Sequence, residues 1–444
     1  MGAEVVLIER GLMGGDCLNF GCVPSKSLLA AARIADFVRR SAAAGITAAG
    51  SCADFAAAAD GVRNVIAAIA PNDSVERFEG FGVKVLRSEA RFTSPHTLRA
   101  GETEIRPRRF VIATGSHPAI PPIPGLADVP YLTNETIFAN RERPDHLIVI
   151  GGGPIGIEMA QAHRRLGARV SVLDVGPLLP RDDPELGAIL AERLSAEGIA
   201  CRPWVAIAAV ERDRHLIRVR LAGGEEIAGS HLLVAAGRRP AVAALDLPAA
   251  GIAVSEKGIT VDARLRTTNR RAFAIGDVAG GPQFTHIALY HAGIVIRNAL
   301  FRIPAKVDYR ALPWVTYTEP ELASVGLTEA AARAAEPRPR VLRWPFAEND
   351  RAQTERSTEG LVKVVTRKNG RILGAAILGA GAGDLILPWA LAIAQKLKIG
   401  TLANLIVPYP TRGEASKRAA ASYYTPTLFS ARTRRIVGLL ARLG

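Results

Sequence analysis

The sequence predicts an α/β fold in which two successive copies of one doubly wound plan, the first of them incomplete, precede a smaller α+β region. Three observations predict this arrangement. Two pairs of segments repeat each other along the chain, one copy contains a complete strand, glycine loop and helix, and antiparallel strand patterns appear only beyond about residue 308. With 444 residues, the chain is long enough for about three domains.

The composition is that of a globular protein, with 48% hydrophobic and 22% charged residues. The sequence contains no run of about eighteen apolar residues and no signal-peptide pattern, so we expect no membrane span and a cytoplasmic protein. Four cysteines are too few for a secreted disulfide scaffold. We expect Cys52 and Cys201 to be ordinary buried thiols.

The net charge of +14 comes mostly from scattered arginines. Because the chain has no nucleic-acid motif and few aromatic residues to stack on bases, we expect no nucleic-acid partner. A solvated basic surface that helps to attract an anionic nucleotide is the favoured interpretation. The basic, amphipathic tail 432–443 is expected to dock on its own protein and not on a membrane.

Two cysteines stand close together near the start, in the stretch Gly-Gly-Asp-Cys-Leu-Asn-Phe-Gly-Cys-Val-Pro-Ser-Lys (14–26). Pro24 lies just inside a run of good helix formers, which places Cys22 near a helix N-terminus. The helix dipole stabilises a thiolate there and lowers its pKa. This favours a redox-active dithiol formed by Cys17 and Cys22. A zinc half-site or two unrelated buried thiols are the alternatives, but no second ligand pair lies nearby, and we predict no metal site.

Two pairs of similar segments along the chain indicate two copies of one domain plan. Residues 1–9 and 166–174 both read apolar-Gly-Ala, an apolar strand and then a carboxylate, and residues 110–115 resemble residues 232–237. The later copy is complete, because strand 147–150 leads through Gly151, Gly153 and Gly156 into a helix and a second strand that ends at Asp174. Strand, glycines, helix, strand and acid together form the Rossmann fingerprint of dinucleotide binding. We expect Gly151 to make the tight turn, Gly153 to admit the pyrophosphate and Gly156 to let helix pack on strand.

The earlier copy opens at its second strand. We expect its first strand, glycine loop and helix to be absent, which leaves neighbouring strands unpaired and removes the cradle for the first nucleotide's pyrophosphate. Two explanations stay open. We expect an in-frame upstream segment that encodes an apolar strand and a G-x-G-x-x-G motif; the alternative is a truncated chain that does not hold that nucleotide.

The remaining elements follow from local patterns. They are, in chain order, a strand at 3–8, a helix at 22–40, a helical region at 55–78 interrupted at Pro71, short strands within 83–112, a helix from 285, antiparallel strands at 314–317, 341–344 and 361–365, and a helical run at 383–397. His286, at the start of its helix, is expected to be a packed or capping residue and not a catalyst.

The stretch 14–26 closely resembles the active-site segment of the flavin-dependent pyridine nucleotide–disulfide oxidoreductases, a family that includes dihydrolipoamide dehydrogenase, glutathione reductase and mercuric reductase. The resemblance covers the whole chain except the absent start. It implies two tandem Rossmann-like FAD- and NAD(P)-binding domains, the first N-terminally truncated, plus a C-terminal α+β dimerisation domain, and hence a homodimer. The implied boundaries are 1–143 for the FAD domain, 144–262 for the NAD(P) domain, 263–307 for the return of the FAD domain and 308–444 for dimerisation.

The resemblance also assigns roles to single residues. Cys22 becomes the thiol that faces the flavin, and Cys17 the exposed thiol that meets substrate and must ionise near neutral pH. Lys26 is expected near the flavin, paired with Glu158. Three further residues are implied at FAD and one at the nicotinamide: Glu9 at the ribose, Gly115 nearby, Asp277 at the ribityl chain, and Gly237 at NAD(P)H.

Asp174 bears on the choice of coenzyme. A carboxylate at this position accepts hydrogen bonds from a ribose 2′-hydroxyl but repels a 2′-phosphate, so NADH is favoured over NADPH.

The last motif, Tyr-Pro-Thr-Arg-Gly-Glu (409–414), supplies two further candidate catalytic residues, Tyr409 and Glu414. Lipoamide and glutathione enzymes carry a His paired with the Glu. Tyr409 is a poor base at neutral pH, and mercuric reductases resemble this chain in having Tyr there. Soft thiolates suit a soft metal ion. Against this, mercuric reductases end in a vicinal cysteine pair, and this sequence has no cysteine beyond Cys201.

The implied function is electron transfer from NAD(P)H through FAD to a Cys17–Cys22 disulfide and on to a small disulfide, thiol or soft-metal substrate, as in a mercuric-reductase-like enzyme. Dihydrolipoamide dehydrogenase is the alternative within the family. A flavin-free, non-catalytic NAD-binding protein is the alternative outside it.

Overall fold

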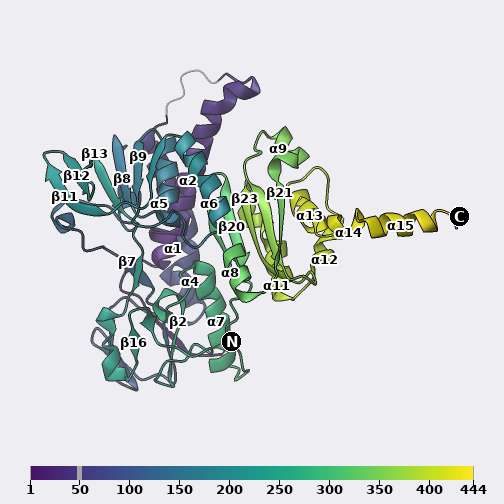
Figure 1. The fold of residues 1–444 in the computed structure, drawn as a ribbon. Helices are drawn as coiled ribbons and strands as arrows, with labels where there is room; N and C mark the ends of the chain where they lie inside the picture. Colours follow the sequence, from purple (N-terminus) through teal and green to yellow (C-terminus); the bar gives the residue numbers. More distant parts are fainter. Residues whose placement is uncertain (1, 48–52, 444) are drawn as a thin grey trace. The chain divides into compact units, whose positions relative to one another are not determined.

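The computed structural model describes residues 2–47 and 53–443. Cys52, expected to be a buried thiol, lies outside the described residues. The chain divides into two compact units, the first made of residues 1–175 and 205–308 and the second of residues 176–204 and 309–444 (Figure 1). The boundary near residue 308 coincides with the expected start of the dimerisation domain. Residues 176–204, within the expected NAD(P) domain, cluster with the C-terminal segment.

The first unit contains both copies of the repeated plan. Its elements are β1 (Val5–Ile8), α1 (Gly15–Asn19), α2 (Cys22–Arg40), α3 (Phe55–Ile69), α4 (Val75–Gly80), β2 (Val83–Leu86), β3 (Ala90–Ser94), β4 (Thr97–Ala100), β5 (Thr103–Ile105), β6 (Phe110–Ile112), β7 (Ser116–Pro118), β8 (His146–Ile150), α5 (Pro154–Arg165), β9 (Arg169–Leu173), β11 (Ile207–Asp213), β12 (Leu216–Leu221), β13 (Glu226–Gly229), β14 (His231–Val234), β15 (Arg238–Pro240), β16 (Val254–Ser255), β17 (Gly258–Ile259), β18 (Ala272–Ala274) and α7 (Thr285–Ala299).

The local predictions agree with these elements. The helix predicted at 22–40 is α2, the region 55–78 breaks after Ile69 as the proline indicated, and the segment 83–112 forms short strands. Within 314–365 the predicted antiparallel strands also form. The helical run at 383–397 is shorter than expected, because it divides at Ile386, just before Pro388, into α10 (Ala382–Leu385) and α11 (Leu387–Ala394).

The two copies share one plan in three dimensions. In the second copy, β8 pairs in parallel with β9 on one side and with β14 on the other. A three-stranded antiparallel sheet accompanies each copy, β3–β4–β5 in the first and β11–β12–β13 in the second. Strands β7 and β15, which follow the two repeated segments, pair antiparallel with each other. The predicted internal repeat is therefore confirmed.

The first copy has an opening where the second copy has β8. Strand β1 pairs with β2 and β6 pairs with β18, but these pairs belong to separate sheets. Val5, Val6 and Val111 are 47%, 41% and 50% exposed, whereas Val172 and Leu233, in the corresponding strands of the second copy, are fully buried. Among the described residues, β1 therefore pairs with β2 alone and β6 with β18 alone, and their outer side chains are more exposed than those of β9 and β14.

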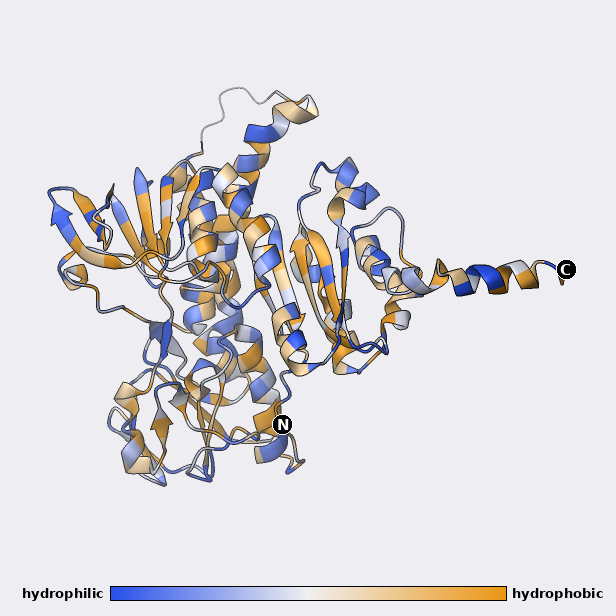
Figure 2. Ribbon diagram, viewed as in Figure 1, coloured by the Kyte–Doolittle hydropathy of each residue, from blue (hydrophilic) through white to orange (hydrophobic). Residues whose placement is uncertain are grey.

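The second unit is built on a five-stranded antiparallel sheet in the order β19-β20-β23-β22-β21. Val362 and Val364 point to one face, where Trp389, Ala415 and Ala419 complete an apolar core; Figure 2 shows these strands largely in orange. The elements of this unit are α6 (Pro184–Ala196), β10 (Ile199–Arg202), β19 (Pro313–Thr316), β20 (Glu321–Gly326), α8 (Glu329–Ala335), β21 (Arg340–Pro345), α9 (Asp350–Thr354), β22 (Leu361–Thr366), β23 (Ile372–Gly379), α10 (Ala382–Leu385), α11 (Leu387–Ala394), α12 (Ile399–Ala403), α13 (Gly413–Ser422), α14 (Thr425–Leu428) and α15 (Ala431–Leu440).

The basic tail forms α15, and no residue of this helix is buried. The expectation that the tail docks on its own protein is therefore wrong within a single chain. No helix in the described parts of the chain combines the length and the apolar character that crossing a bilayer requires.

Candidate functional site

The two neighbouring cysteines lie on either side of a tight turn, Cys17 within α1 and Cys22 at the start of α2. Gly14, with φ +85°, caps α1, and Gly21 caps α2, which begins at Cys22. A Cβ on Gly14 would come within 2.4 Å of the Leu18 side chain, so the turn requires glycine there. The predicted position of Cys22 at a helix N-terminus is confirmed.

The thiols of Cys17 and Cys22 are free and hydrogen-bond each other, as in the reduced form of a dithiol pair. The pKa of Cys22 is lowered to about 6, first by the hydrogen bond from Cys17 and then by Thr285 and the charge of Lys26, against the effect of burial. Its Sγ lies 3.2 Å from Thr285 Oγ1, at the start of α7. A thiolate at Cys22 is therefore favoured at neutral pH.

The lower pKa belongs to Cys22 and not to Cys17, the thiol that was expected to ionise near neutral pH. Cys17 was expected to be the exposed thiol that ionises readily, but it is half-buried, while Cys22 is exposed. The hydrogen bond to Cys22 and burial raise the pKa of Cys17. The physical reason is that a proton shared by two thiols stays on one of them, and Thr285 and Lys26 favour the charge on Cys22.

Lys26 and Glu158 form the pair that the sequence predicted. Lys26 Nζ donates to Glu158 Oε2 at 2.9 Å, and the Glu158 side chain is only 5% exposed. One partner lies in the first turns of α2 and the other on α5. The pairing is confirmed and places a cation next to the Cys22 thiol.

Asp277 belongs to a polar network that the sequence did not predict. Its Oδ2 accepts a hydrogen bond from Ser116 Oγ at 2.6 Å and lies 3.7 Å from Arg238 Nε. Arg238 also reaches Asp16 Oδ1 at 3.2 Å, next to Cys17, and Asn134 donates to the same oxygen. One feature of the sequence could have indicated this network: Ser116 and Arg238 stand at the same position after the last glycine of the two repeated segments.

The glycine loop of the second copy has the predicted geometry. Gly151 has φ +117°, and a Cβ there would lie 2.3 Å from the Ala235 carbonyl oxygen. A Cβ on Gly156 would lie 1.9 Å from the Gly151 oxygen, whereas a Cβ on Gly153, the cap of α5, would meet nothing within 4 Å. Gly153 therefore presents the open surface that a pyrophosphate needs.

Four other predicted residues lie at strand ends or turns. Asp174, after β9, accepts a hydrogen bond from the Gly152 N–H at 2.6 Å, which fixes its carboxylate beside the glycine loop. Glu9, after β1, accepts from the Gly11 N–H at 2.7 Å. Gly115 and Gly237 both have positive φ, +71° and +118°, at the equivalent turns of the two copies.

Tyr409 and Glu414 do not pair with each other as the family's His and Glu do. Tyr409 Oη donates to Asp350 Oδ2 at 2.7 Å, which raises the pKa of the phenol, and Glu414 accepts from Arg418 at 3.0 Å. Both residues lie in the second unit, and Tyr409 is exposed. The partner of Tyr409 is far away in sequence, so the motif alone did not reveal it.

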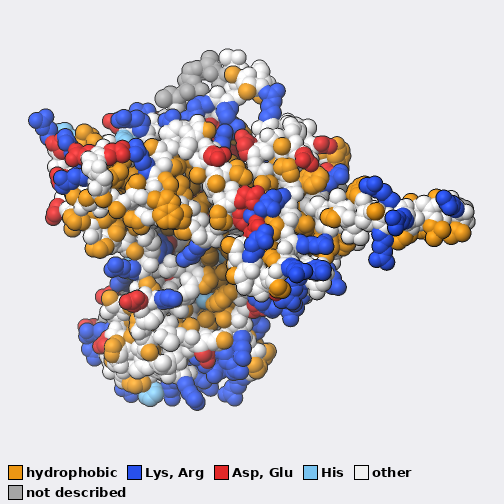
Figure 3. Space-filling view, viewed as in Figure 1, with side chains coloured by type: hydrophobic (Ala, Val, Ile, Leu, Met, Phe, Trp, Pro, Cys, Tyr) orange, Lys and Arg blue, Asp and Glu red, His pale blue; other side chains and the backbone are white. Residues whose placement is uncertain are grey.

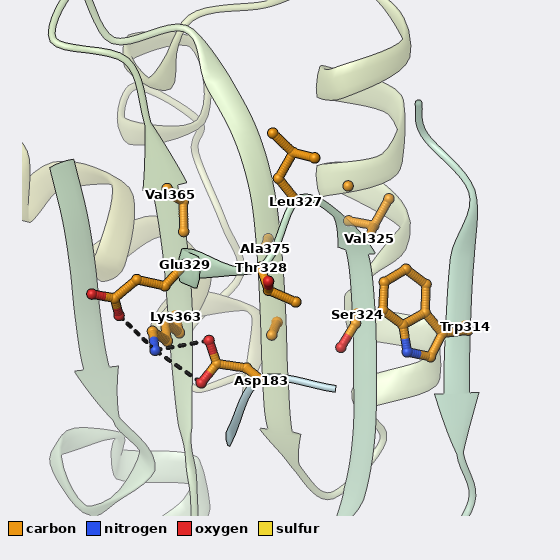
Figure 4. A pocket seen from close by; sticks show the side chains of 12 residues that line it. Asp183, Trp314, Ser324, Val325, Leu327, Thr328, Glu329, Lys363, Val365 and Ala375 are labelled. Carbon is orange, nitrogen blue, oxygen red and sulfur yellow. Dashed lines mark hydrogen bonds and ion pairs between the residues drawn. The ribbon is translucent and has the colours of Figure 1, made fainter. Parts of the chain in front are cut away.

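A separate pocket in the second unit contains none of the predicted site residues (Figure 4). At its floor Lys363, 4% exposed, lies 2.8 Å from carboxylate oxygens of Asp183, Glu185 and Glu329. Arg343 reaches Glu185 and Glu329 at 2.8 and 2.9 Å. Several carboxylates thus compensate the charge of the buried lysine, and we interpret the cluster as one that serves structure.

Comparisons with known proteins agree with this geometry. Residues 1–292 match the model of the pyridine nucleotide-disulphide oxidoreductase family, and residues 312–420 match the model of that family's dimerisation domain. A mercuric reductase from Streptomyces lividans is 37% identical over 437 residues, covering 95% of this chain and 91% of the relative. A dihydrolipoyl dehydrogenase from Geobacillus stearothermophilus is 34% identical over 432 residues, with the same coverage of both chains.

The fold is similar to that of a solved enzyme. The HOCl-induced flavoprotein disulfide reductase RclA from Escherichia coli aligns with a TM-score of 0.86 and 29% identity, over 95% of this chain and 94% of that chain. Both parts of the sequence match, the Cys17–Cys22 turn lies beside the Lys26–Glu158 pair, and the glycine loop is intact. This chain therefore belongs to the pyridine nucleotide-disulphide oxidoreductase family of enzymes.

Proposed function

We propose that this protein is a homodimeric, mercuric-reductase-like flavoprotein that transfers electrons from NAD(P)H, preferably NADH, through FAD to the Cys17–Cys22 pair and on to a small disulfide, thiol or soft-metal substrate. The observation that carries the proposal is the position of Cys22 at the start of α2, with its Sγ 3.2 Å from Thr285 Oγ1 and the Lys26–Glu158 pair nearby, where its pKa is lowered. A thiolate is the reactive form both in disulfide exchange and in binding a soft metal ion.

The described residues fit the reactive end of a flavin. The family resemblance implies the Cys22 thiol and the Lys26 ammonium at the ring and the Asp277 carboxylate at the ribityl chain, and the contacts of these groups with Thr285, Glu158 and Ser116 support that assignment. The proposal concerns the contacts of the ring and the ribityl chain.

When bound, FAD would accept a hydride from NAD(P)H and pass two electrons to a disulfide. The protein's own residues then have defined tasks. Lys26, held by Glu158, stabilises negative charge at Cys22, and Thr285 orients its sulfur. The two electrons and two protons convert the Cys17–Cys22 disulfide into two thiols. The dithiol can cleave a substrate disulfide into two thiols or deliver two electrons to a mercuric ion, and the internal disulfide forms again.

The substrate side of the proposal rests on Tyr409. The phenol of Tyr409 donates a hydrogen bond to Asp350, and its pKa is raised. Tyr409 therefore does not act as a base at neutral pH. This favours a soft metal ion, which needs no general base, over lipoamide. Mercuric ion supplied with excess thiol should stimulate NADH oxidation at least tenfold more than lipoamide does, since a missing general base costs about 10²–10⁴ in rate.

The test uses the purified full chain with added FAD. We expect a yellow protein that bleaches on anaerobic addition of NADH and regains its colour with mercuric ion or a small disulfide. Faster turnover with lipoamide than with mercuric ion would favour the dihydrolipoamide dehydrogenase alternative, in line with the Geobacillus relative. A colourless protein that binds NADH but does not oxidise it would support a non-catalytic NAD-binding protein instead.

A further inference from the structure

The segment that follows α13 lies beyond the matches to the family models. The match to the dimerisation model ends at residue 420, and α14 and α15 follow it. Ser430 caps α15 by accepting a hydrogen bond from Thr433 N–H at 3.1 Å, and Thr433 Oγ1 donates to the Thr427 carbonyl at 2.7 Å. These bonds fix the start of α15 on α14, and Figure 1 shows the helix extending from there to the C-terminus.

The surface of α15 is apolar on one side and basic on the other. Within α15, Ile436 and Leu440 fall on one face at 3.6 residues per turn, with Arg432 one turn before them, and Arg435 falls on another face. Arg442 and Leu443 follow the end of the helix at Leu440. Figure 3 shows orange side chains along one edge of this helix and blue ones elsewhere on it. The apolar side chains of Ile436, Leu440 and Leu443 are 48%, 57% and 77% exposed.

The charge around this face has one sign. After Glu414 the chain contains no Asp or Glu, and its ionisable cations are Lys417, Arg418, Arg432, Arg434, Arg435 and Arg442. An exposed helix that combines an apolar stripe, an arginine face and low overall hydrophobicity is the type that lies in the interface of an anionic membrane.

We propose that α15 attaches this protein to the surface of membranes that contain anionic lipids. Ile436, Leu440 and Leu443 enter the boundary between head groups and acyl chains, and Arg435 and Arg442 lie at the level of the lipid phosphates. The helix lies in the plane of the surface and does not span the bilayer. The proposal is independent of the enzyme's substrate, because it rests only on the tail.

The experiment is co-sedimentation of the full chain with vesicles of phosphatidylcholine containing about one third phosphatidylglycerol, compared with vesicles of phosphatidylcholine alone. We expect binding to the anionic vesicles at least roughly tenfold tighter, weakening as salt is raised. The double variant Ile436→Ser/Leu440→Ser should lose this binding, and Arg435→Gln/Arg442→Gln should weaken it by about tenfold.

The matched control is Arg91→Gln/Arg338→Gln, which removes the same charge from exposed positions outside the tail and should leave binding unchanged. Since no residue of α15 is buried, the tail variants should unfold at the wild-type temperature. Equal binding by wild type and both tail variants would overturn the proposal, as would no preference for anionic vesicles. A change in oligomeric state caused by Ile436→Ser/Leu440→Ser, seen by light scattering without vesicles, would assign α15 to a contact between copies and would also overturn it.

Discussion

Lys26 Nζ lies 2.9 Å from Glu158 Oε2, so the helix that starts at the reactive thiol is tied to the helix that follows the glycine loop. Glu158 holds the ammonium group in place, and the ammonium favours the thiolate of Cys22. The pair therefore connects the nucleotide-binding copy to the sulfur chemistry through electrostatics.

The first prediction concerns this charge. Lys26→Met should raise the pKa of Cys22 by about one unit, because an opposite charge within a few ångströms typically contributes that much. The measurement is the rate of iodoacetamide alkylation of the reduced protein against pH, which needs no bound flavin. Lys26→Arg should keep the wild-type profile, and Lys84→Met, at an exposed position, is the matched control. An unchanged profile for Lys26→Met would show that the lysine serves structure alone.

The second prediction concerns the shared proton. The hydrogen bond from Cys17 is the largest cause of the lowered pKa of Cys22, ahead of Thr285. Cys17→Ala should therefore move the alkylation midpoint of Cys22 from about 6 toward the ordinary thiol value of 9.0, and Thr285→Val should move it less. Cys201, whose pKa is raised by burial, should react only in alkaline solution. Rapid alkylation of Cys201 at pH 7 would contradict this order.

The third prediction concerns coenzyme choice. Asp174→Asn keeps an oxygen that can accept from the Gly152 N–H but removes the charge that repels a 2′-phosphate. We expect the ratio of kcat/KM for NADH to that for NADPH to fall by about tenfold, equivalent to roughly 1.4 kcal/mol. If wild type and variant discriminate equally, Asp174 does not contact the ribose.

The fourth prediction concerns Tyr409. Asp350→Asn should lower the pKa of the phenol, because the hydrogen bond to this carboxylate and its charge are what raise it. Ultraviolet titration of the tyrosines would detect one group that ionises earlier than in the wild type. Tyr409→His should raise lipoamide turnover above the wild-type level, since a histidine supplies a base near neutral pH. No gain with lipoamide would mean that more than this residue separates the two activities.

Local sequence patterns predicted the parts of this molecule in which neighbours in sequence are neighbours in space. The cysteine turn and the glycine loop depend on residues a few positions apart, because tight turns demand glycine wherever a Cβ would clash. The pairing of Lys26 with Glu158 required the family resemblance. The partners of Asp277 and Tyr409, and the thiol that carries the charge, depend on tertiary contacts and on the competition of two thiols for one proton, which no local pattern encodes.

The same limit applies to the ion cluster of the second unit, in which Asp183 and Lys363 meet from distant parts of the sequence. The hydrogen bond from Arg343, together with Lys363, lowers the pKa of Glu185 to about 2, below the ordinary value of 4.5. A carboxyl group whose folded pKa is depressed adds stability above its unfolded pKa and loses that contribution as the pH falls. The free energy of unfolding should therefore decrease between about pH 4.5 and pH 2.

The fifth prediction tests the cluster directly. Lys363→Met leaves several carboxylates facing one another at a site where the lysine side chain is only 4% exposed. Loss of one partner of a buried pair costs roughly 3–5 kcal/mol, because the remaining charge stays desolvated. Urea denaturation at pH 7 should show this loss, and the difference in unfolding free energy between wild type and variant should shrink toward pH 4 as the carboxylates become protonated.

The control is Lys368→Met, at an exposed position of the same sheet region, which should change stability by less than about 0.5 kcal/mol. Equal stability of the two variants at pH 7 would mean that the carboxylates are already compensated by other groups.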